Sequence, residues 1–281
     1  MKLLVEVSSK DSLFLEDSDG IILALEDFSV ESVCYFTLDE IISIKNSTKK
    51  EVFVKLNKNF FNDEIDKLKD VLIKLDEARI DGVFFYDLAV LELKRELNLK
   101  IEVVWNQTHM VNNYRTCNYY YEKGCKYALL GKEITLEEIL EIIKNSKINC
   151  MVEVVSLPSV AFSRRHLVSN YYHDLEKSSK NEILIHEKVS DMNYRVLEDN
   201  NGTCFYLDSV TNGTSIIKDL YDAGCSYIIL REFGIDNFGE LVSDTFKYIE
   251  SGCSDSSYVS KYEKLGDSTN FFFKKTIYKV K

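Results

Sequence analysis

"YEKGCKYALLGKE" (121–133) and "YDAGCSYIILREF" (221–233) are two similar stretches that lie a hundred residues apart. In each, a helical pattern reaches a glycine, Gly124 or Gly224, and glycine is the residue that most often follows the end of a helix. A near-continuous apolar run comes directly after each glycine. Such runs are typical of parallel strands that are covered on both faces. The two stretches therefore predict a repeated joint between a helix and a buried strand.

Eight such apolar runs occur along the chain, with helical patterns between them. The runs occupy residues 3–7, 20–25, 51–56, 82–87, 101–105, 126–131, 150–155 and 226–231. Helical periodicity is clear over 62–80, and Thr135 followed by Glu138 forms a capping box that predicts the start of another helix. This alternation predicts an α/β fold, a (β/α)8 TIM-type barrel. An open doubly wound sheet is the alternative, although no Gly-x-Gly-x-x-Gly follows any run.

We expect a single barrel domain over residues 1–281 with one insertion. The stretch from roughly 163 to 215 does not fit one strand–helix unit, and it predicts a helix plus a hairpin between the seventh and eighth strands. The C-terminal stretch, roughly 258–281, ends in alternating apolar and basic residues. This ending predicts a final strand or a tail that packs across the barrel.

The formal net charge of -11 argues against binding of bulk DNA, because non-specific binding to nucleic acid comes from clustered Lys and Arg. It leaves room for a specific RNA held by a local patch. The N-terminal residues turn polar after Val7, and no apolar run approaches the roughly 18 residues that span a membrane. We therefore expect a cytoplasmic protein without a membrane partner.

Seven cysteines and four histidines are present, and none of them forms a familiar metal motif. There is no Cys-x-x-Cys, and the closest cysteine pair is Cys117 and Cys125. We interpret the cysteines as reduced thiols that fill the core, and we expect no metal site.

Barrel enzymes place their sites on the loops that follow the strands. The loop after the fifth run contributes Trp105, Asn106, Thr108 and Asn112, where amides and a hydroxyl could orient a polar ligand and the indole could stack on it. Helix capping and turn formation are the alternative roles for these polar residues. Asn57 and Lys132 follow the third and sixth runs, and Arg231 ends the eighth and is a further candidate for substrate binding.

"FSRRHLVSNYY" (162–172) follows the seventh run and allows several interpretations. Ser163 and His166 would share a helix face as nucleophile and base, but no Gly-x-Ser-x-Gly is present, and a helix cap explains Ser163 better. Arg164 and Arg165 could bind a carboxylate or phosphate at a helix start, or could form an exposed pair. In "LEDNNGTCFY" (197–206), Glu198 and Asp199 are candidate acids or residues that shape a hairpin turn.

Three stretches resemble the collagenase-like U32 peptidase family, in particular its shorter branch. They are "WNQTHMVNNYRTCNYYYEKGCKYALLGKEITLEEI" (105–139), "VEVVSLPSVAFSRRHLVSNYY" (152–172) and "RVLEDNNGTCFY" (195–206). The resemblance implies a barrel-like fold and site roles for Glu153, Ser163, Arg164 and the 198–202 turn. It also implies a part in oxygen-independent hydroxylation, such as 5-hydroxyuridine formation in tRNA with prephenate as a possible co-substrate.

Many members of that family hold a [4Fe–4S] cluster on four cysteines. In this chain Ser159 and His166 stand at two of the matching positions, and the later cysteine pair has no counterpart. Soft thiolate ligands are what such clusters require. The resemblance therefore implies that this chain holds no cofactor alone and that a [4Fe–4S] cluster comes only through a partner.

Three hypotheses follow. The first is a protein of tRNA modification that works on tRNA or another RNA, together with a larger cysteine-bearing paralogue. The second is a peptidase, as the family name suggests. The third is a non-catalytic binding or scaffold subunit.

Overall fold

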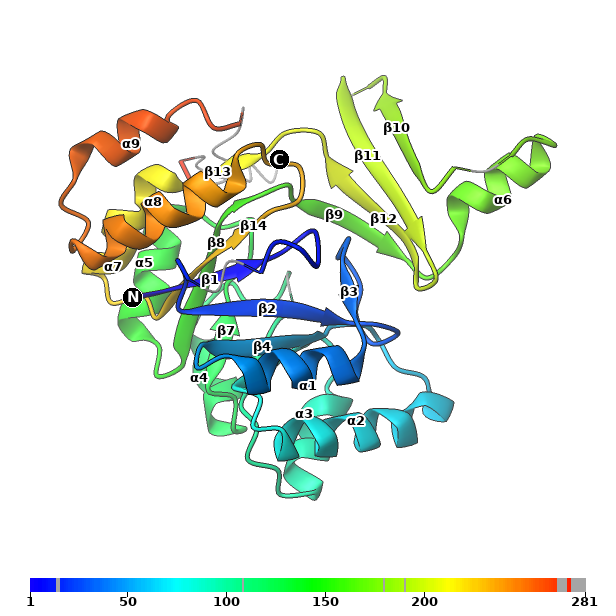
Figure 1. Cartoon of the computed structure of the whole chain (residues 1–281), viewed down its shortest axis with the longest axis horizontal. Helices are drawn as coiled ribbons and strands as arrows, with labels where there is room; N and C mark the ends of the chain where they lie inside the picture. Colours follow the sequence, from blue (N-terminus) through cyan, green and yellow to red (C-terminus); the bar gives the residue numbers. More distant parts are fainter. Residues whose placement is uncertain (14–15, 108, 179, 190, 267–271, 274–281) are drawn as a thin grey trace, which may run out of the picture.

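Eight parallel strands close into a barrel in the computed structural model, which describes residues 1–13, 16–107, 109–178, 180–189, 191–266 and 272–273 (Figure 1). The strands are β1 (Lys2–Glu6), β2 (Gly20–Leu25), β4 (Glu51–Leu56), β5 (Gly82–Phe85), β6 (Val103–Trp105), β7 (Tyr127–Leu129), β8 (Asn149–Ser156) and β14 (Tyr227–Arg231). Each strand pairs with the next in this order, and β1 pairs with both β2 and β14, which closes the ring. The predicted (β/α)8 barrel is confirmed.

Helices cover the outside of the barrel: α1 (Leu38–Ser47), α2 (Ile65–Glu77), α3 (Ala89–Glu96), α4 (Tyr114–Glu122), α5 (Leu136–Asn145), α7 (Ile217–Asp222) and α8 (Phe238–Glu250). The predicted capping box is confirmed at the start of α5, where Thr135 and Glu138 bond each other's backbone N–H groups. Gly124 and Gly224 follow the ends of α4 and α7 with φ of 96° and 81°. Those positive φ values favour glycine and explain the repeated joint.

The interior of the barrel is filled by a cluster of large side chains. The Phe53 ring meets the rings of Phe84, Tyr127 and Tyr227 edge-on, with centroids 5.8–5.9 Å apart. Tyr127 and Tyr227 are the first residues of β7 and β14, so this aromatic layer closes the amino-terminal end of the barrel. Open space is left at the carboxyl-terminal end.

The arm (residues 159–207) lies between β8 and β14 and contains the predicted helix and hairpin, but it starts earlier than predicted. It begins with a strand, β9 (Ser159–Ser163), and continues through α6 (Leu167–Asp174), β10 (Glu182–Glu187), β11 (Met192–Asp199) and β12 (Gly202–Leu207). The strands form an antiparallel sheet in the order β10-β11-β12-β9. The expected helix start at Ser163 is wrong, because β9 pairs with β12 as far as Ser163 and the helix begins only at Leu167.

Short elements complete the chain: β3 (Tyr35–Phe36), β13 (Thr211–Asn212), the 3-10 turns Asn62–Glu64 and Thr214–Ile216, and α9 (Ser256–Tyr262). The strand expected near the C-terminus falls mostly outside the described residues, and α9 occupies the start of that stretch. Among the described residues, no helix combines the length and apolar character needed to cross a membrane.

Candidate functional site

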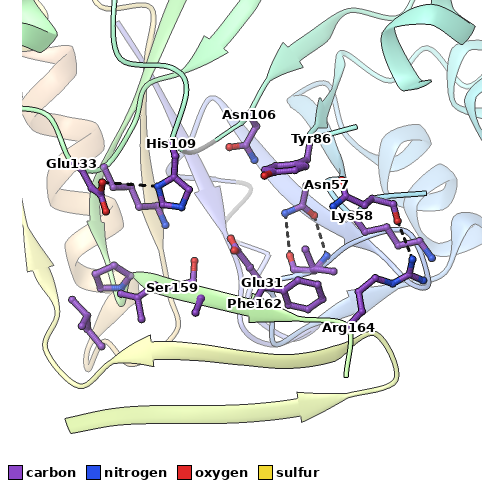
Figure 2. Close-up of a pocket in the computed structure, with 17 residues that line it drawn as sticks. Glu31, Asn57, Lys58, Tyr86, Asn106, His109, Glu133, Ser159, Phe162 and Arg164 are labelled. Carbon is purple, nitrogen blue, oxygen red and sulfur yellow. Dashed lines mark hydrogen bonds and ion pairs between the residues drawn. The ribbon is translucent and has the colours of Figure 1, made fainter. Parts of the chain in front are cut away.

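A cavity of about 370 Å³ lies between the carboxyl-terminal end of the barrel and the arm (Figure 2). Loops that follow the barrel strands contribute Asn57, Lys58, Tyr86, Asn106 and Lys132, and the arm contributes Ser159, Phe162 and Arg164. The volume is within the range of small-molecule sites, which runs from about 300 to about 1,000 Å³. The position is where barrel enzymes bind their substrates.

A buried cluster of charges lies beneath this cavity. Glu6 of β1 accepts a hydrogen bond from the Lys55 ammonium at 2.9 Å, and its other oxygen is 3.2 Å from Nε of Arg231. Arg231 Nε also lies 2.7 Å from Glu153 of β8, and Lys132 lies 3.2 Å from the same carboxylate. Opposite charges at this spacing stabilise one another strongly away from water. The cluster therefore joins β1, β4, β8 and β14 to the loop after β7, where Lys132 lines the cavity.

Glu153 stays ionised within this cluster. Burial raises the pKa of its carboxyl, but Arg231 and Lys132 more than offset burial and bring the pKa down to about 2. The Ser156 hydroxyl donates a further hydrogen bond at 2.5 Å. A permanently charged Glu153 holds the Lys132 ammonium at the cavity wall.

The amides at the cavity differ in their partners. Asn57 exchanges two hydrogen bonds with the backbone of Val30, at 3.0 and 3.1 Å, and so fixes the loop after β2. Asn106 is only 6% exposed, and its Oδ1 has no hydrogen-bond partner among the described residues. Leaving such an atom unpaired is costly and is typical of functional sites.

The rim of the cavity is organised around Glu64. Its carboxylate accepts hydrogen bonds from the Lys58 ammonium at 2.7 Å and from the backbone N–H of Phe61 at 2.8 Å. It also lies 3.8 Å from the Arg164 guanidinium. That guanidinium is 3.9 Å from the centroid of the Phe61 ring. Figure 2 shows Arg164 reaching from the arm toward Lys58.

Several residues predicted from the loop after β6 lie away from the cavity lining. Trp105 is fully buried, stacks on Tyr120 at 3.9 Å and donates to Gln107, so it packs in the core. Asn112 is exposed and donates to the carbonyl of His109. Thr108 lies outside the described residues. Of this group, Asn106 lines the cavity.

The residues predicted from the arm have separate roles. Ser163 is the last residue of β9, and its hydroxyl accepts a hydrogen bond from the backbone N–H of Arg165 at 3.2 Å. Arg165 itself is exposed and does not line the cavity. Glu198 accepts hydrogen bonds from the N–H groups of Val168 and Ser169 and caps α6. Asp199 accepts from the Tyr35 hydroxyl at 2.6 Å and so ties the hairpin to the barrel.

Sequence reasoning missed Glu6, Lys55, Tyr86 and Phe61. A signal was present for the first two, because each is a charged residue inside an apolar strand, and a buried charge requires a partner. Phe61 carries no such signal, because exposed single apolar residues are common.

The seven cysteines do not fit a [4Fe–4S] cluster held by this chain alone. All are free and buried, and they lie on α4, β8 and β12 and in four different loops. Burial raises the pKa of the Cys117 thiol to about 11 and of the Cys204 and Cys225 thiols to about 12, which disfavours the thiolate that a cluster needs. Over the described part of the chain, no three His, Cys, Asp or Glu side chains gather as metal ligands.

Comparison with known proteins gives one consistent result. The family model for "Peptidase family U32" matches residues 14–235. The chain is 28% identical over 302 residues to "tRNA hydroxylation protein P2" of Bacillus subtilis, covering 98% of this chain and 94% of the relative. It is 23% identical to "tRNA hydroxylation protein P1" of the same organism, covering 55% of this chain but 37% of that longer protein.

Among solved structures, a U32 peptidase is 17% identical with a TM-score of 0.46, over 62% of this chain and 75% of the other. The family match extends from the loop after β1 to the loop after β14 and includes the whole arm. The chain therefore belongs to peptidase family U32.

Proposed function

We propose that this chain acts in tRNA hydroxylation, in the formation of 5-hydroxyuridine. The observation that carries the proposal is the similarity to tRNA hydroxylation protein P2, which extends over nearly the full length of both chains. The aligned region thus includes the residues of both the barrel and the arm. Fold alone would not support a function, because barrels host many chemistries.

The site is compatible with a polar, anionic substrate. The cavity wall carries the cations Lys58, Lys132 and Arg164, against the carboxylates of Glu31 and Glu133, and the ion pair with Glu153 keeps Lys132 in place. Because the whole chain carries a net charge of -11, RNA would be held by this local patch and not by the overall field. The same cations suit a small carboxylate co-substrate such as prephenate.

We propose in addition that the chain works with a larger, cysteine-bearing paralogue. Its own thiols do not fit an iron–sulfur cluster, so the partner would supply that group. The existence of two similar proteins, P1 and P2, named for the same process in one organism supports a partnership.

Mass spectrometry of tRNA nucleosides tests the proposal. A strain deleted for this gene should lose the nucleosides derived from 5-hydroxyuridine, and the wild-type gene on a plasmid should restore them. Normal levels in the deleted strain would overturn the proposal. Lys132 also pairs with the buried Glu153, so complementation with Lys132→Met is compared at a matched level of folded protein. At that level a scaffold would still restore the nucleosides, whereas a working site that needs the ammonium would not.

The peptidase alternative has less support in the geometry. The Ser163 hydroxyl bonds the backbone of Arg165, and the His166 ring lies 3.9 Å from Glu198. Among the described residues, no hydrogen bond joins Ser163 to His166. Peptide turnover by the purified protein, lost in Ser163→Ala, would restore this alternative.

A further inference from the structure

A second cavity, of about 330 Å³, adjoins the first. Lys58 and Arg164 line both cavities and lie between them. The second cavity is also lined by Phe60, Lys67 and the hairpin turn Asn200–Asn201. It lies where the arm meets the loops after β2 and β4.

Hydrogen bonds from both the arm and the barrel fix the residues between the two cavities. The Asn201 amide donates to the carbonyl of Ser29 at 3.1 Å, which fixes the hairpin turn against the barrel. On the barrel side, Glu64 holds Lys58 and the backbone of Phe61. Arg164 therefore projects from the arm into a framework that hydrogen bonds keep rigid.

Phe61 lines neither cavity but lies against Arg164, which lines both, and 59% of the Phe61 surface is exposed. One face of the ring carries the Arg164 guanidinium, with 3.9 Å between the guanidinium carbon and the ring centroid. An aromatic ring and a guanidinium plane are the two surfaces on which proteins stack unpaired nucleic-acid bases. Their mutual contact keeps both planes oriented without a ligand.

The charge around the second cavity suits a phosphate backbone. Lys58, Lys67 and Arg164 contribute three positive charges, against the two carboxylates of Asp27 and Glu64. The local balance is thus positive on a chain of net charge -11. Base stacking beside a locally cationic groove is the usual arrangement for single-stranded nucleic acid.

We propose that Phe61 and Arg164 form a stacking platform for a nucleotide next to the one that enters the first cavity. The backbone of this single-stranded RNA segment passes along the second cavity, past Lys58 and Lys67. This inference rests on the proposed function, because it takes RNA as the substrate. It adds a second point of contact outside the reaction site.

Binding of a fluorescein-labelled pentauridylate to the purified full chain tests the platform. Phe61→Ala should weaken binding about tenfold, as is typical for loss of one stacked base, and Phe61→Trp should keep the affinity. Arg164→Ala should also weaken binding and reduce the slope of log affinity against log salt by about 1. Phe61 is exposed, so we expect these variants to keep the wild-type melting temperature.

Tyr119→Ala is the matched control. Tyr119 is 55% exposed and carries the Lys123 ammonium 5.3 Å from its ring centroid. Lys123 lines neither cavity, whereas Arg164, the cation on the Phe61 ring, lines both. Its loss should leave the affinity unchanged. A set of pentanucleotides, each lacking one base, adds a chemical test: at one position, removal of the base should abolish the difference between wild type and Phe61→Ala.

Equal affinity of wild type and Phe61→Ala, an equal loss in Tyr119→Ala, or no binding of the RNA would each overturn the inference. The deletion strain answers the other question separately. If the deletion strain loses the tRNA nucleosides but Phe61→Ala binds RNA as well as wild type does, the proposed function stands and the platform is wrong. If the deletion strain keeps normal nucleosides but Phe61→Ala binds RNA more weakly than wild type, the platform stands and the proposed function is wrong.

Discussion

Glu153 shows how a buried charge is kept in this protein. Burial raises the pKa of the carboxyl, and the two neighbouring cations, Arg231 and Lys132, lower it by more, to about 2. Removing one partner of a buried ion pair leaves the others uncompensated, which costs more than the pair contributes when intact. Glu153 is thus required both for stability and for the position of Lys132.

We expect Glu153→Gln to lower the free energy of unfolding by about 3 kcal/mol at neutral pH. The folded pKa lies below the unfolded one, so the contribution of the carboxylate is fully present above about pH 4.5 and is lost as pH falls toward about 2. The difference between wild type and variant should therefore shrink over that window in urea denaturation. Glu133→Gln, exposed at the rim, is the control, and a difference independent of pH would contradict this account.

Helix α6 depends on a residue from another element for its start. His166 precedes the first turn but provides no side-chain cap. The carboxylate of Glu198, on β11, accepts the N–H groups of Val168 and Ser169 and also the Ser169 hydroxyl. Burial raises the pKa of Glu198, and these hydrogen bonds lower it by more, so the carboxylate remains charged at the positive end of the helix.

Glu198→Gln should loosen α6 while leaving the barrel intact. Loss of a cap costs about 1 kcal/mol, which corresponds to about fivefold faster amide exchange if the helix opens locally. Hydrogen–deuterium exchange followed by mass spectrometry on residues 167–174 measures the effect. Asp199→Asn is the matched control, because the partners of Asp199 are Tyr35 and the turn at Asn201. Equal exchange in both variants would refute the capping role.

The arm and the barrel share a small hydrophobic cluster. Leu157, Cys204 and Tyr206 are buried together, with Phe233 packed against them. The rings of Tyr206 and Phe233 meet with centroids 5.2 Å apart. This contact joins the sheet of the arm to the loop after β14. That residues 1–281 form one domain remains a prediction.

Leu157→Ala should lower the free energy of unfolding by about 3 kcal/mol, because the buried leucine leaves a cavity at the junction. If the arm and barrel form one cooperative unit, both wild type and variant should unfold in a single calorimetric transition. Val189→Ala is the control, because that side chain is 95% exposed at the tip of the arm. Two separate transitions in the wild type would show that the arm is an independent domain.

Local patterns were enough to predict the barrel. Each of the eight apolar runs became a barrel strand, with ends within a few residues of the prediction, as for β4 at Glu51–Leu56. The capping box at Thr135 and the glycines after α4 and α7 mark the same helix ends in sequence and structure. These signals depend on neighbouring residues alone, since burial on both faces requires a continuous apolar run.

The loop rule predicted part of the site, including Asn106 and Arg164. It could not separate them from Trp105 and Asn112, because loop membership does not determine which side chains face the cavity. Ser163 was predicted to start a helix but ends the strand β9, whose pairing partner, β12, lies about forty residues later. Pairing across such a distance leaves no local periodicity.

The order of strands and helices, and hence the barrel, was therefore determined by the sequence itself. Tertiary structure alone decided that Glu6, Lys55, Glu153 and Arg231 share one buried cluster and that Arg164 reaches Phe61. The physical reason is that secondary structure follows from burial patterns along a few turns of chain. Charge pairs and stacking contacts instead require barrel closure, which brings together residues from opposite ends of the chain.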